Sequence, residues 1–158
     1  PRYQERSAEQ IPKAESADGL ASATVIAGEA LGVHAAITTH TPIHYHHWRL
    51  APGAQVETEL PAGLGCFVYV FEGEALVGPD EVTVSDGQVA MMGDGDSVRL
   101  SVPAGAQQGA QLLLLAGEPL REPVARYGPF VMNEPDEIRT AIDDYQAGRM
   151  GRIPAELA

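Results

Sequence analysis

The sequence predicts an all-β domain, a sandwich or barrel of short strands, followed by one C-terminal helix. Short apolar segments alternate with turns from Ala23 onward. The chain has 17 glycines and 12 prolines, and most fall in those turns, where a positive or a fixed φ is useful. Evenly spaced short strands separated by Gly and Pro are typical of sandwiches and barrels. No long helical pattern occurs before residue 133.

Each predicted strand is a short apolar segment bounded by turn residues. Residues 1–22 show no sustained period and are rich in Ala, Glu and Ser, so we expect an N-terminal arm or linker there. We expect the β domain to span residues 23–132, and a helix with its tail to span residues 133–158. In chain order the predicted strands are residues 23–28, 32–38, 44–50, 66–73, 74–78, 81–84, 89–92, 97–102 and 110–117.

The helix is predicted from its start, its face and its end. Asn133 is a suitable N-cap, Pro135 fits the first turn, and Asp136 and Glu137 suit the positive end of the helix dipole. Gly148 supplies a stop. One apolar face follows from the i, i+3, i+4, i+7 spacing of four residues: Ile138, Ala141, Ile142 and Tyr145.

Composition bounds the class of protein. A length of 158 residues suits one domain with a real core. The net charge of −12 argues against nucleic acid, whose phosphates are bound by Lys and Arg. The longest apolar run, Leu112 to Ala116, is far short of the ~20 residues of a membrane span. The single cysteine, Cys66, excludes an internal disulfide and agrees with a reducing compartment, so we expect a cytoplasmic protein.

All five histidines lie between residues 34 and 47, and the motif HYHH at residues 44–47 raises the question of a metal site. Alternate residues of a strand share a face, so His44 and His46 lie in one row with Trp48 and Leu50, which favour the buried side. They could clamp a metal or an aromatic, hydroxylated ligand. The alternative, which we favour, is two histidines near the mouth of the domain, bonded to water or backbone.

A metal needs a third and usually a fourth donor, and no histidine lies outside residues 34–47. His34 and His40 are expected at strand or turn edges without a function. Cys66 opens an apolar strand, so burial is expected rather than redox reactivity.

Other residues with chemical potential have simpler interpretations. The acidic pairs Glu57/Glu59 and Asp94/Asp96 could suggest paired-carboxylate chemistry, but GDGD favours a turn for backbone reasons. In YGPFVMN, residues 127–133, the aromatic side chains are expected to pack an extended tail on a domain face.

Two stretches resemble the two motifs of the cupin barrel, G-x5-H-x-H-x3,4-E-x6-G and G-x5-P-x-G-x2-H. They are PGAQVETELPAGLGCFVYVFEGEALVG and GDGDSVRLSVPAGAQQGAQLLLLAG. The resemblance implies a cupin fold, which is a double-stranded β-helix or jelly-roll barrel. Aligned on Gly53, Gly73 and the turn at residues 103–105, the metal-ligand positions fall on Glu59, Pro61, Cys66 and Gln108.

These four residues are a poor set of donors. A cupin metal site uses imidazole and carboxylate ligands, which suit iron, manganese, nickel or copper. Pro61 has no donor, Gln108 offers a weak oxygen ligand, and a lone cysteine is more often a small buried hydrophobe. We therefore predict no metal, no bound cofactor and no catalytic residue in this chain, with His44 and His46 as the only candidate ligand contacts.

A narrower resemblance, to the C-terminal half of the pirin family, covers most of the chain. It is strongest in GEPLREPVARYGPFVMN, residues 117–133. The other stretches are PRYQ at the start, IPKAESADG, VIAGEALG, TPIHYHHWRLAPGA, FVYVFEGEALVGP and the closing DEIRTAIDDYQAGRMGRIP. His44 and His46 depart from the family, whose members are more often apolar at these positions.

The resemblance implies a protein with two cupin domains. In pirins the N-terminal barrel holds one iron with three histidines and a glutamate, and the C-terminal barrel usually lacks a metal. The family is associated with quercetin 2,3-dioxygenase-like activity and with regulatory protein contacts, including transcriptional cofactor roles. Because the resemblance is to the C-terminal half of the family, we expect only the second barrel here, and the opening on Pro1 suggests a processed chain or a piece of a longer one. The iron and the main partner are then expected in an N-terminal cupin domain that is absent.

Three functions remain open. The chain could be the metal-free half of an iron dioxygenase, shaping a pocket that takes a small flavonoid-like ligand. It could instead be a regulatory module whose acidic surface and helix dock on another protein. The third, a free-standing cupin that uses His44 and His46, lacks the ligands that such a site needs. The residues alone do not separate the first two.

Overall fold

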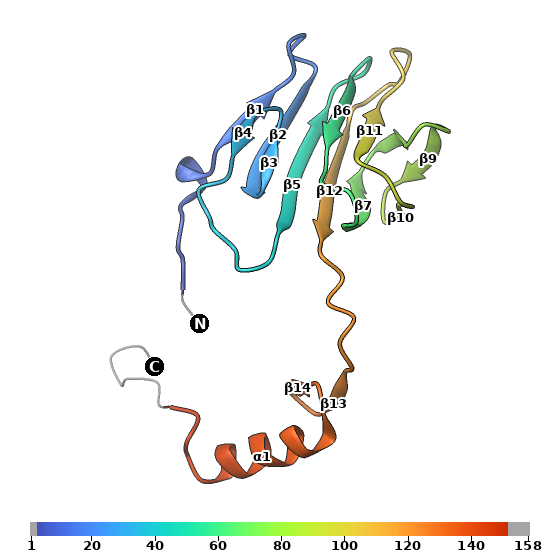
Figure 1. Ribbon diagram of the computed structural model, residues 1–158. Helices are drawn as coiled ribbons and strands as arrows, with labels where there is room; N and C mark the ends of the chain where they lie inside the picture. The colour runs from blue at the N-terminus through green and yellow to red at the C-terminus, as the bar shows by residue number, and fades with distance from the viewer. Residues whose placement is uncertain (1–2, 152–158) are drawn as a thin grey trace. The chain divides into compact units, whose positions relative to one another are not determined.

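The computed structural model describes residues 3–151, and the chain divides into two compact units, one ending at Pro119 and one beginning at Leu120 (Figure 1). The first unit consists almost entirely of short antiparallel strands. Among the described residues, no helix has the length and apolar character needed to cross a membrane. The elements of the first unit are the short 3-10 helix η1 (Ala8–Gln10) and the strands β1 (Lys13–Glu15), β2 (Ala21–Ala27), β3 (Glu29–Ala30), β4 (Val33–His34), β5 (Ile43–Leu50), β6 (Gln55–Glu59), β7 (Gly65–Glu72), β8 (Glu74–Val77), β9 (Val82–Ser85), β10 (Val89–Met91), β11 (Ser97–Ser101) and β12 (Ala110–Gly117).

The larger sheet has six strands in the order β1-β2-β5-β12-β7-β10. Its centre is β12, which coincides with the predicted strand at residues 110–117. Leu112 lies opposite Trp48 of β5 on one side and Val70 of β7 on the other. Because side chains alternate along a strand, Leu112 and Leu114 point inward and are fully buried. The run of four leucines is thus one strand with a buried face and a half-buried face.

The smaller sheet has four strands in the order β6-β11-β8-β9, so β6 is at an edge. The backbone N–H of Leu60 donates to the carbonyl of Asp96 at 2.8 Å, and that of Val102 donates to the carbonyl of Ala54 at 3.0 Å. Backbone groups of successive residues point to opposite sides of a strand. The even-numbered residues of β6 therefore bond to β11, while the N–H and C=O groups of the odd-numbered residues face the free edge.

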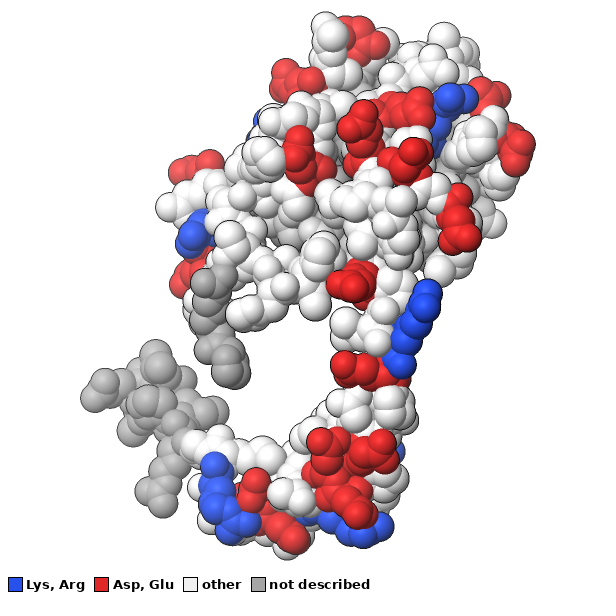
Figure 2. Space-filling view, in the orientation of Figure 1, with Lys and Arg blue, Asp and Glu red and all other residues white. Residues whose placement is uncertain are grey.

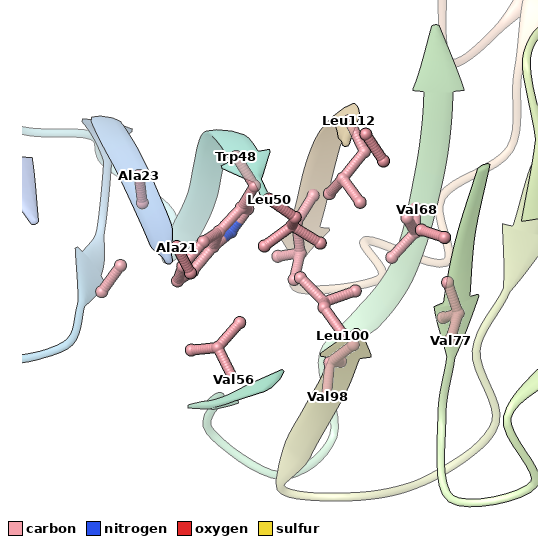
Figure 3. Packing of buried hydrophobic residues seen from close by; sticks show 14 of the residues in the cluster. Ala21, Ala23, Trp48, Leu50, Val56, Val68, Val77, Val98, Leu100 and Leu112 are labelled. Atoms are coloured by element: carbon pink, nitrogen blue, oxygen red, sulfur yellow. The ribbon is translucent and has the colours of Figure 1, made fainter. Parts of the chain in front are cut away.

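The two sheets pack face to face, and their inner side chains form one core (Figure 3). Trp48, Leu50 and Val68 come from the larger sheet, and Val98 and Leu100 from the smaller one. Trp48, Val68 and Leu100 have no exposed surface. Full burial of a side chain of this size contributes roughly 1.5–3 kcal/mol. The architecture is the predicted all-β fold, except that backbone pairing among the described residues leaves two open sheets rather than a closed barrel.

Several strand predictions were wrong or incomplete. Only Val33 and His34 of the predicted strand at residues 32–38 pair, as β4 of a small hairpin with β3. No strand was predicted at β1 or β6. Strand β6 has the sequence QVETE, in which Val56 and Thr58 point inward and the other three residues are exposed. Because Thr58 is itself polar, the alternation of buried and exposed residues is not visible as an alternation of apolar and polar residues.

The second unit contains a hairpin and the predicted helix. Strands β13 (Ala125–Tyr127) and β14 (Phe130–Met132) pair around Gly128, so YGPFVMN is not an extended tail, and Tyr127 is exposed. Helix α1 (Pro135–Gln146) begins one residue later than predicted. The backbone N–H of its N-cap, Glu134, donates to Glu137 at 2.8 Å. Asn133 instead uses its side-chain amide to donate to Glu122 and to the carbonyl of Pro123.

The predicted face of α1 is confirmed in its first two turns. Ile138 and Ala141 are buried, whereas Tyr145 is 68% exposed. The Tyr145 ring meets Phe130 of β14 edge-on, with a centroid distance of 6.3 Å. After the helix, Gly148 adopts a φ of 67°, which agrees with its predicted role as a stop.

Candidate functional site

Strand β5 places its histidines on both faces of the larger sheet. His44 and His46 lie on the inner row with Trp48 and Leu50, as the alternation predicts, and all four are buried. His47 lies on the opposite face, where its Nε2 donates to Gln111 at 3.0 Å. Of the remaining histidines, His40 is exposed, and His34 pairs with Glu29 at 3.2 Å near the surface. The structure therefore brings two of the five together in the interior.

His46 is a buried titratable group without a strong partner. Neither ring nitrogen makes a hydrogen bond of normal geometry within the described residues. Its ring lies between those of His44 and Trp48, with centroid distances of 5.6 and 6.2 Å. Burial lowers the pKa of His46 from 6.5 to about 4; the nearby His44 adds to this effect, and a looser contact with the Ala27 backbone opposes it. His46 is therefore neutral at physiological pH.

His44 lies closer to the surface and is held from one side. Its Nδ1 is 3.4 Å from the carbonyl of Glu29, and a carbonyl can only accept, so Nδ1 is the donor of this contact. Gly28 makes this approach possible. A Cβ on Gly28 would lie 2.7 Å from Nδ1 of His44 and 2.8 Å from the carbonyl of Ile43.

His44 forms part of the lining of a cleft of about 1140 Å³ between the β3–β4 hairpin and the edge strand β6. Thr58 lines the same cleft from β6. It is 1% exposed, and its hydroxyl has no hydrogen-bond partner in the part of the chain that the structure describes. Sequence reasoning missed Thr58, although the alternation of Val56, Thr58 and Leu60 could have marked it as an inward residue.

Carboxylates surround this cleft. Glu29 and Glu57 have basic partners, since His34 lies beside Glu29 and Arg99 lies 3.5 Å from Glu57. A hydrogen bond from Ser97 and the charge of Arg99 lower the pKa of Glu57. Two further carboxylates complete the lining, and within residues 3–151 neither has an ion-pair partner: Glu59 and Asp96.

The predicted cupin ligand positions do not form one site. Glu59 and Pro61 are exposed, because the inward residues of β6 are its even-numbered ones. Cys66 is buried at the end of β7 that pairs with Ala116. Gln108 precedes the opposite end of β12 and is exposed, so placing the last ligand there was wrong.

The second cupin motif, G-x5-P-x-G-x2-H, can also be aligned by placing its first glycine on Gly87 instead of using the turn at residues 103–105. This alignment agrees better with the structure, because it places the last position of the motif on an inward residue. Its histidine position then falls on Val98, which lies in register with Thr58 on the neighbouring strand and is buried. The inward set becomes Thr58, Leu60, Cys66 and Val98, which offers neither imidazole nor carboxylate. Iron, which prefers such ligands in this fold, does not fit these residues. Among residues 3–151, no three His, Cys, Asp or Glu side chains come together in a way that could hold a metal ion.

The other candidates are the thiol of Cys66 and two pairs of carboxylates. Cys66 is buried, as predicted, and desolvation raises its pKa to about 11, so its thiol is not an activated nucleophile. Glu57 and Glu59 point outward from the edge strand β6. Asp94 and Asp96 lie in the turn before β11 and border a smaller hollow of about 580 Å³.

Comparison with known proteins identifies the family. Residues 45–151 match the model of the pirin C-terminal cupin domain. The chain is 42% identical to pirin from Homo sapiens over 153 residues and 40% identical to a pirin-like protein from Solanum lycopersicum over 152 residues. Each alignment covers 96% of this chain and 51% of the relative.

A solved structure gives the same result. The crystal structure of quercetin 2,3-dioxygenase from Acinetobacter baumannii superimposes with a TM-score of 0.84 at 33% identity, covering 96% of this chain and 51% of that one. The chain thus spans about half the length of these relatives. Its fold is the cupin fold, and the chain belongs to the pirin family, in which it corresponds to the C-terminal cupin domain.

Proposed function

We propose that this chain is the metal-free half of a pirin-like protein with two cupin domains, and that the whole protein is an iron-dependent dioxygenase of the quercetin 2,3-dioxygenase type. Iron would be held by the N-terminal domain, which is also the main partner of this chain. The chain itself would cover the open face of that domain, shape the pocket between the two and exclude water, without a catalytic residue of its own.

One observation carries the proposal. The inward positions of the cupin motifs hold Thr58, Leu60, Cys66 and Val98, while almost the whole chain aligns with half of a quercetin 2,3-dioxygenase. A chain that keeps the fold of such an enzyme but lacks imidazole and carboxylate at these positions is suited to support rather than to chemistry. The single buried thiol agrees with the reducing cytoplasm as its location.

The proposal is tested by comparing residues 1–158 with the complete gene product that contains them. Metal analysis after dialysis should find well below one equivalent of iron in residues 1–158. The complete protein should hold iron and oxidise quercetin in its presence. A stoichiometric iron in residues 1–158 that disappears in the His44→Ala variant would contradict the assignment of the metal to the other domain.

The alternative is a regulatory module that acts through protein contacts. Acidic side chains outnumber basic ones on the face shown in Figure 2, in keeping with the net charge of −12. A complete protein that holds iron, shows no turnover of quercetin and binds a protein partner with residues 1–158 would favour this alternative over the enzyme half.

A further inference from the structure

The two sheets differ in the side chains that they present on their outer faces. Side chains alternate along a strand, so an antiparallel sheet with one face in water is normally polar on that face. The smaller sheet follows this rule, because Arg99 and Ser97 of β11 both contact Glu57 of β6 on its outer side. The outward residues of these two strands include Gln55, Glu57, Glu59, Ser97 and Arg99.

The larger sheet breaks the rule across four neighbouring strands, β5, β12, β7 and β10 (Figure 1). The register of these strands places their outward side chains in two transverse rows. One row consists of Tyr45, Leu115, Phe67 and Met91, and the next consists of His47, Leu113, Tyr69 and Val89. None of these residues is Asp, Glu, Lys or Arg. We call this surface the apolar outer face.

The apolar outer face is separate from the core. Within residues 3–151, none of its side chains is buried, and none of its apolar ones packs against the buried cluster between the sheets. On the edge strand β10, Val89 is 53% exposed and Met91 is 75% exposed. Beyond the row of His47 the sheet becomes polar, with Arg49, Gln111 and Glu72 side by side. An apolar centre with a polar rim is the usual composition of a protein interface.

The dimensions of the face also suit an interface. Strands about 4.8 Å apart and alternate residues about 6.8 Å apart give the two rows an area of roughly 19 Å by 14 Å. This is about a third of the roughly 800 Å² that each partner contributes to a standard interface, so it has the size of the apolar centre of one.

The comparisons and the topology indicate what covers the face. The pirin relatives are covered to 51% of their length, and the matched part is their C-terminal cupin domain, so the rest of a relative comes before it. A domain that precedes this chain would enter it through β1, which is an edge strand of the larger sheet rather than of the smaller one. A second copy is a poorer occupant, because two chains with a net charge of −12 repel each other.

We propose that the N-terminal cupin domain docks on the apolar outer face, with the rows that begin at Tyr45 and His47 in the centre of the contact. This inference rests on the two-domain architecture proposed above and adds the surface through which the two domains meet. The docked surface of the N-terminal domain would be apolar at its centre, since a charge placed against these rows would be buried without a partner.

Oxidation of Met91 by dilute hydrogen peroxide, followed by mass spectrometry, tests the proposal. Its exposed thioether should react readily in residues 1–158. In the complete gene product the reaction should be roughly five- to tenfold slower, because the docked domain covers the sulfur. Equal rates in the two proteins would overturn the proposal. A rate that falls in residues 1–158 as the concentration of this chain rises would also overturn it, by assigning the face to a second copy.

Two matched variants locate the contact. Val89→Glu and Val82→Glu each replace a valine that is 53% or 57% exposed, the first on the apolar outer face and the second on the smaller sheet. In the complete protein, Val89→Glu should reduce the protection of Met91 to less than about twofold, because a carboxylate would be buried without a partner. Val82→Glu should keep the full protection. Equal protection in both variants would show that the domains meet elsewhere.

Residues 1–158 provide the control for folding and for local effects on the sulfur. In this chain both variants should keep the fluorescence of Trp48 and the oxidation rate of Met91, since neither residue is buried there. A Val89→Glu chain that alters the rate without the N-terminal domain would contradict the assignment of the effect to docking.

The outcome is separable from that of the proposed activity. A complete protein that holds no iron and leaves quercetin unchanged, but protects Met91, would contradict the activity and support the docking face. A complete protein that holds iron and oxidises quercetin while Met91 reacts as it does in residues 1–158 would overturn the docking face alone.

Discussion

Replacing His46 by leucine should remove most of the loss of stability that the β-sandwich suffers in mild acid. His46 is fully buried between His44 and Trp48 and has no normal hydrogen bond in the described residues. A proton on its ring would place an unpaired charge in the core, which is costly in a medium of low polarity. Leucine is of similar size and carries no proton, so the variant keeps the packing and loses the titration.

The size of the effect follows from linkage between protonation and folding. Burial lowers the pKa of His46 from 6.5 to about 4, so between these values the unfolded chain binds a proton that the folded chain refuses. Stability is therefore complete above pH 6.5 and decreases as the pH falls toward 4. At about 1.4 kcal/mol for each pKa unit, the total is about 3 kcal/mol, of which about 2 kcal/mol is lost between pH 7 and pH 5.

Urea unfolding followed by tryptophan fluorescence measures this effect, because Trp48 is the single tryptophan and lies in the core. The free energy of unfolding should fall by about 2 kcal/mol more between pH 7 and pH 5 in the original chain than in His46→Leu. His40→Gln removes an exposed histidine and should behave as the original chain does. Equal pH dependence in His46→Leu and the original chain would refute the reasoning, since it would show that His46 accepts its proton in the folded state.

Three further predictions concern packing and reactivity. Gly28→Ala should destabilise the chain by at least about 2 kcal/mol in urea unfolding, because the φ of Gly28 is +79° and the new Cβ would lie 2.7 Å from Nδ1 of His44. Gly32→Ala is the control, since Gly32 has a φ of +77° but open space around it, and it should cost only about 1 kcal/mol. Equal costs for the two variants would contradict the steric argument. Leu100→Ala should cost about 2–5 kcal/mol, since Leu100 has no exposed surface, and a loss under about 1 kcal/mol would mean that the sheets close over the cavity. Cys66, with its pKa near 11, should react with a thiol reagent at pH 8 only after unfolding, so rapid reaction of the folded chain would show that β7 opens locally.

Strands with a continuous or alternating apolar pattern could be predicted from sequence, and those stabilised only by their neighbours could not. Strand β12 was located at both ends, because Ala110, Leu112, Leu114 and Ala116 all point into the core. Strand β6 was missed, since two glutamates in five residues hide its inward face and the strand forms only because β11 supplies backbone partners. Strand assignment in such segments depends on tertiary pairing rather than on local preference.

The candidate site shows the same limit. Alternation along β5 was enough to place His44 and His46 on the inner face. The cleft could not be predicted from the sequence. It depends on how the β3–β4 hairpin approaches β6, and β6 lies more than twenty residues further along the chain. The cupin motif was read in the wrong register at Gln108, since residues 103–105 have the Pro-x-Gly pattern where no ligand position exists. Only the pairing of Val98 with Thr58 shows which residues face each other.

The enclosed position of the single thiol has a practical consequence for spectroscopy. A maleimide dye or nitroxide offered to the folded chain would find no competing native thiol at its surface, because Cys66 is the single cysteine and is buried. A cysteine introduced at an exposed position of β6 could therefore carry one probe per molecule without first deleting Cys66, and its signal would report directly on whatever occupies that edge.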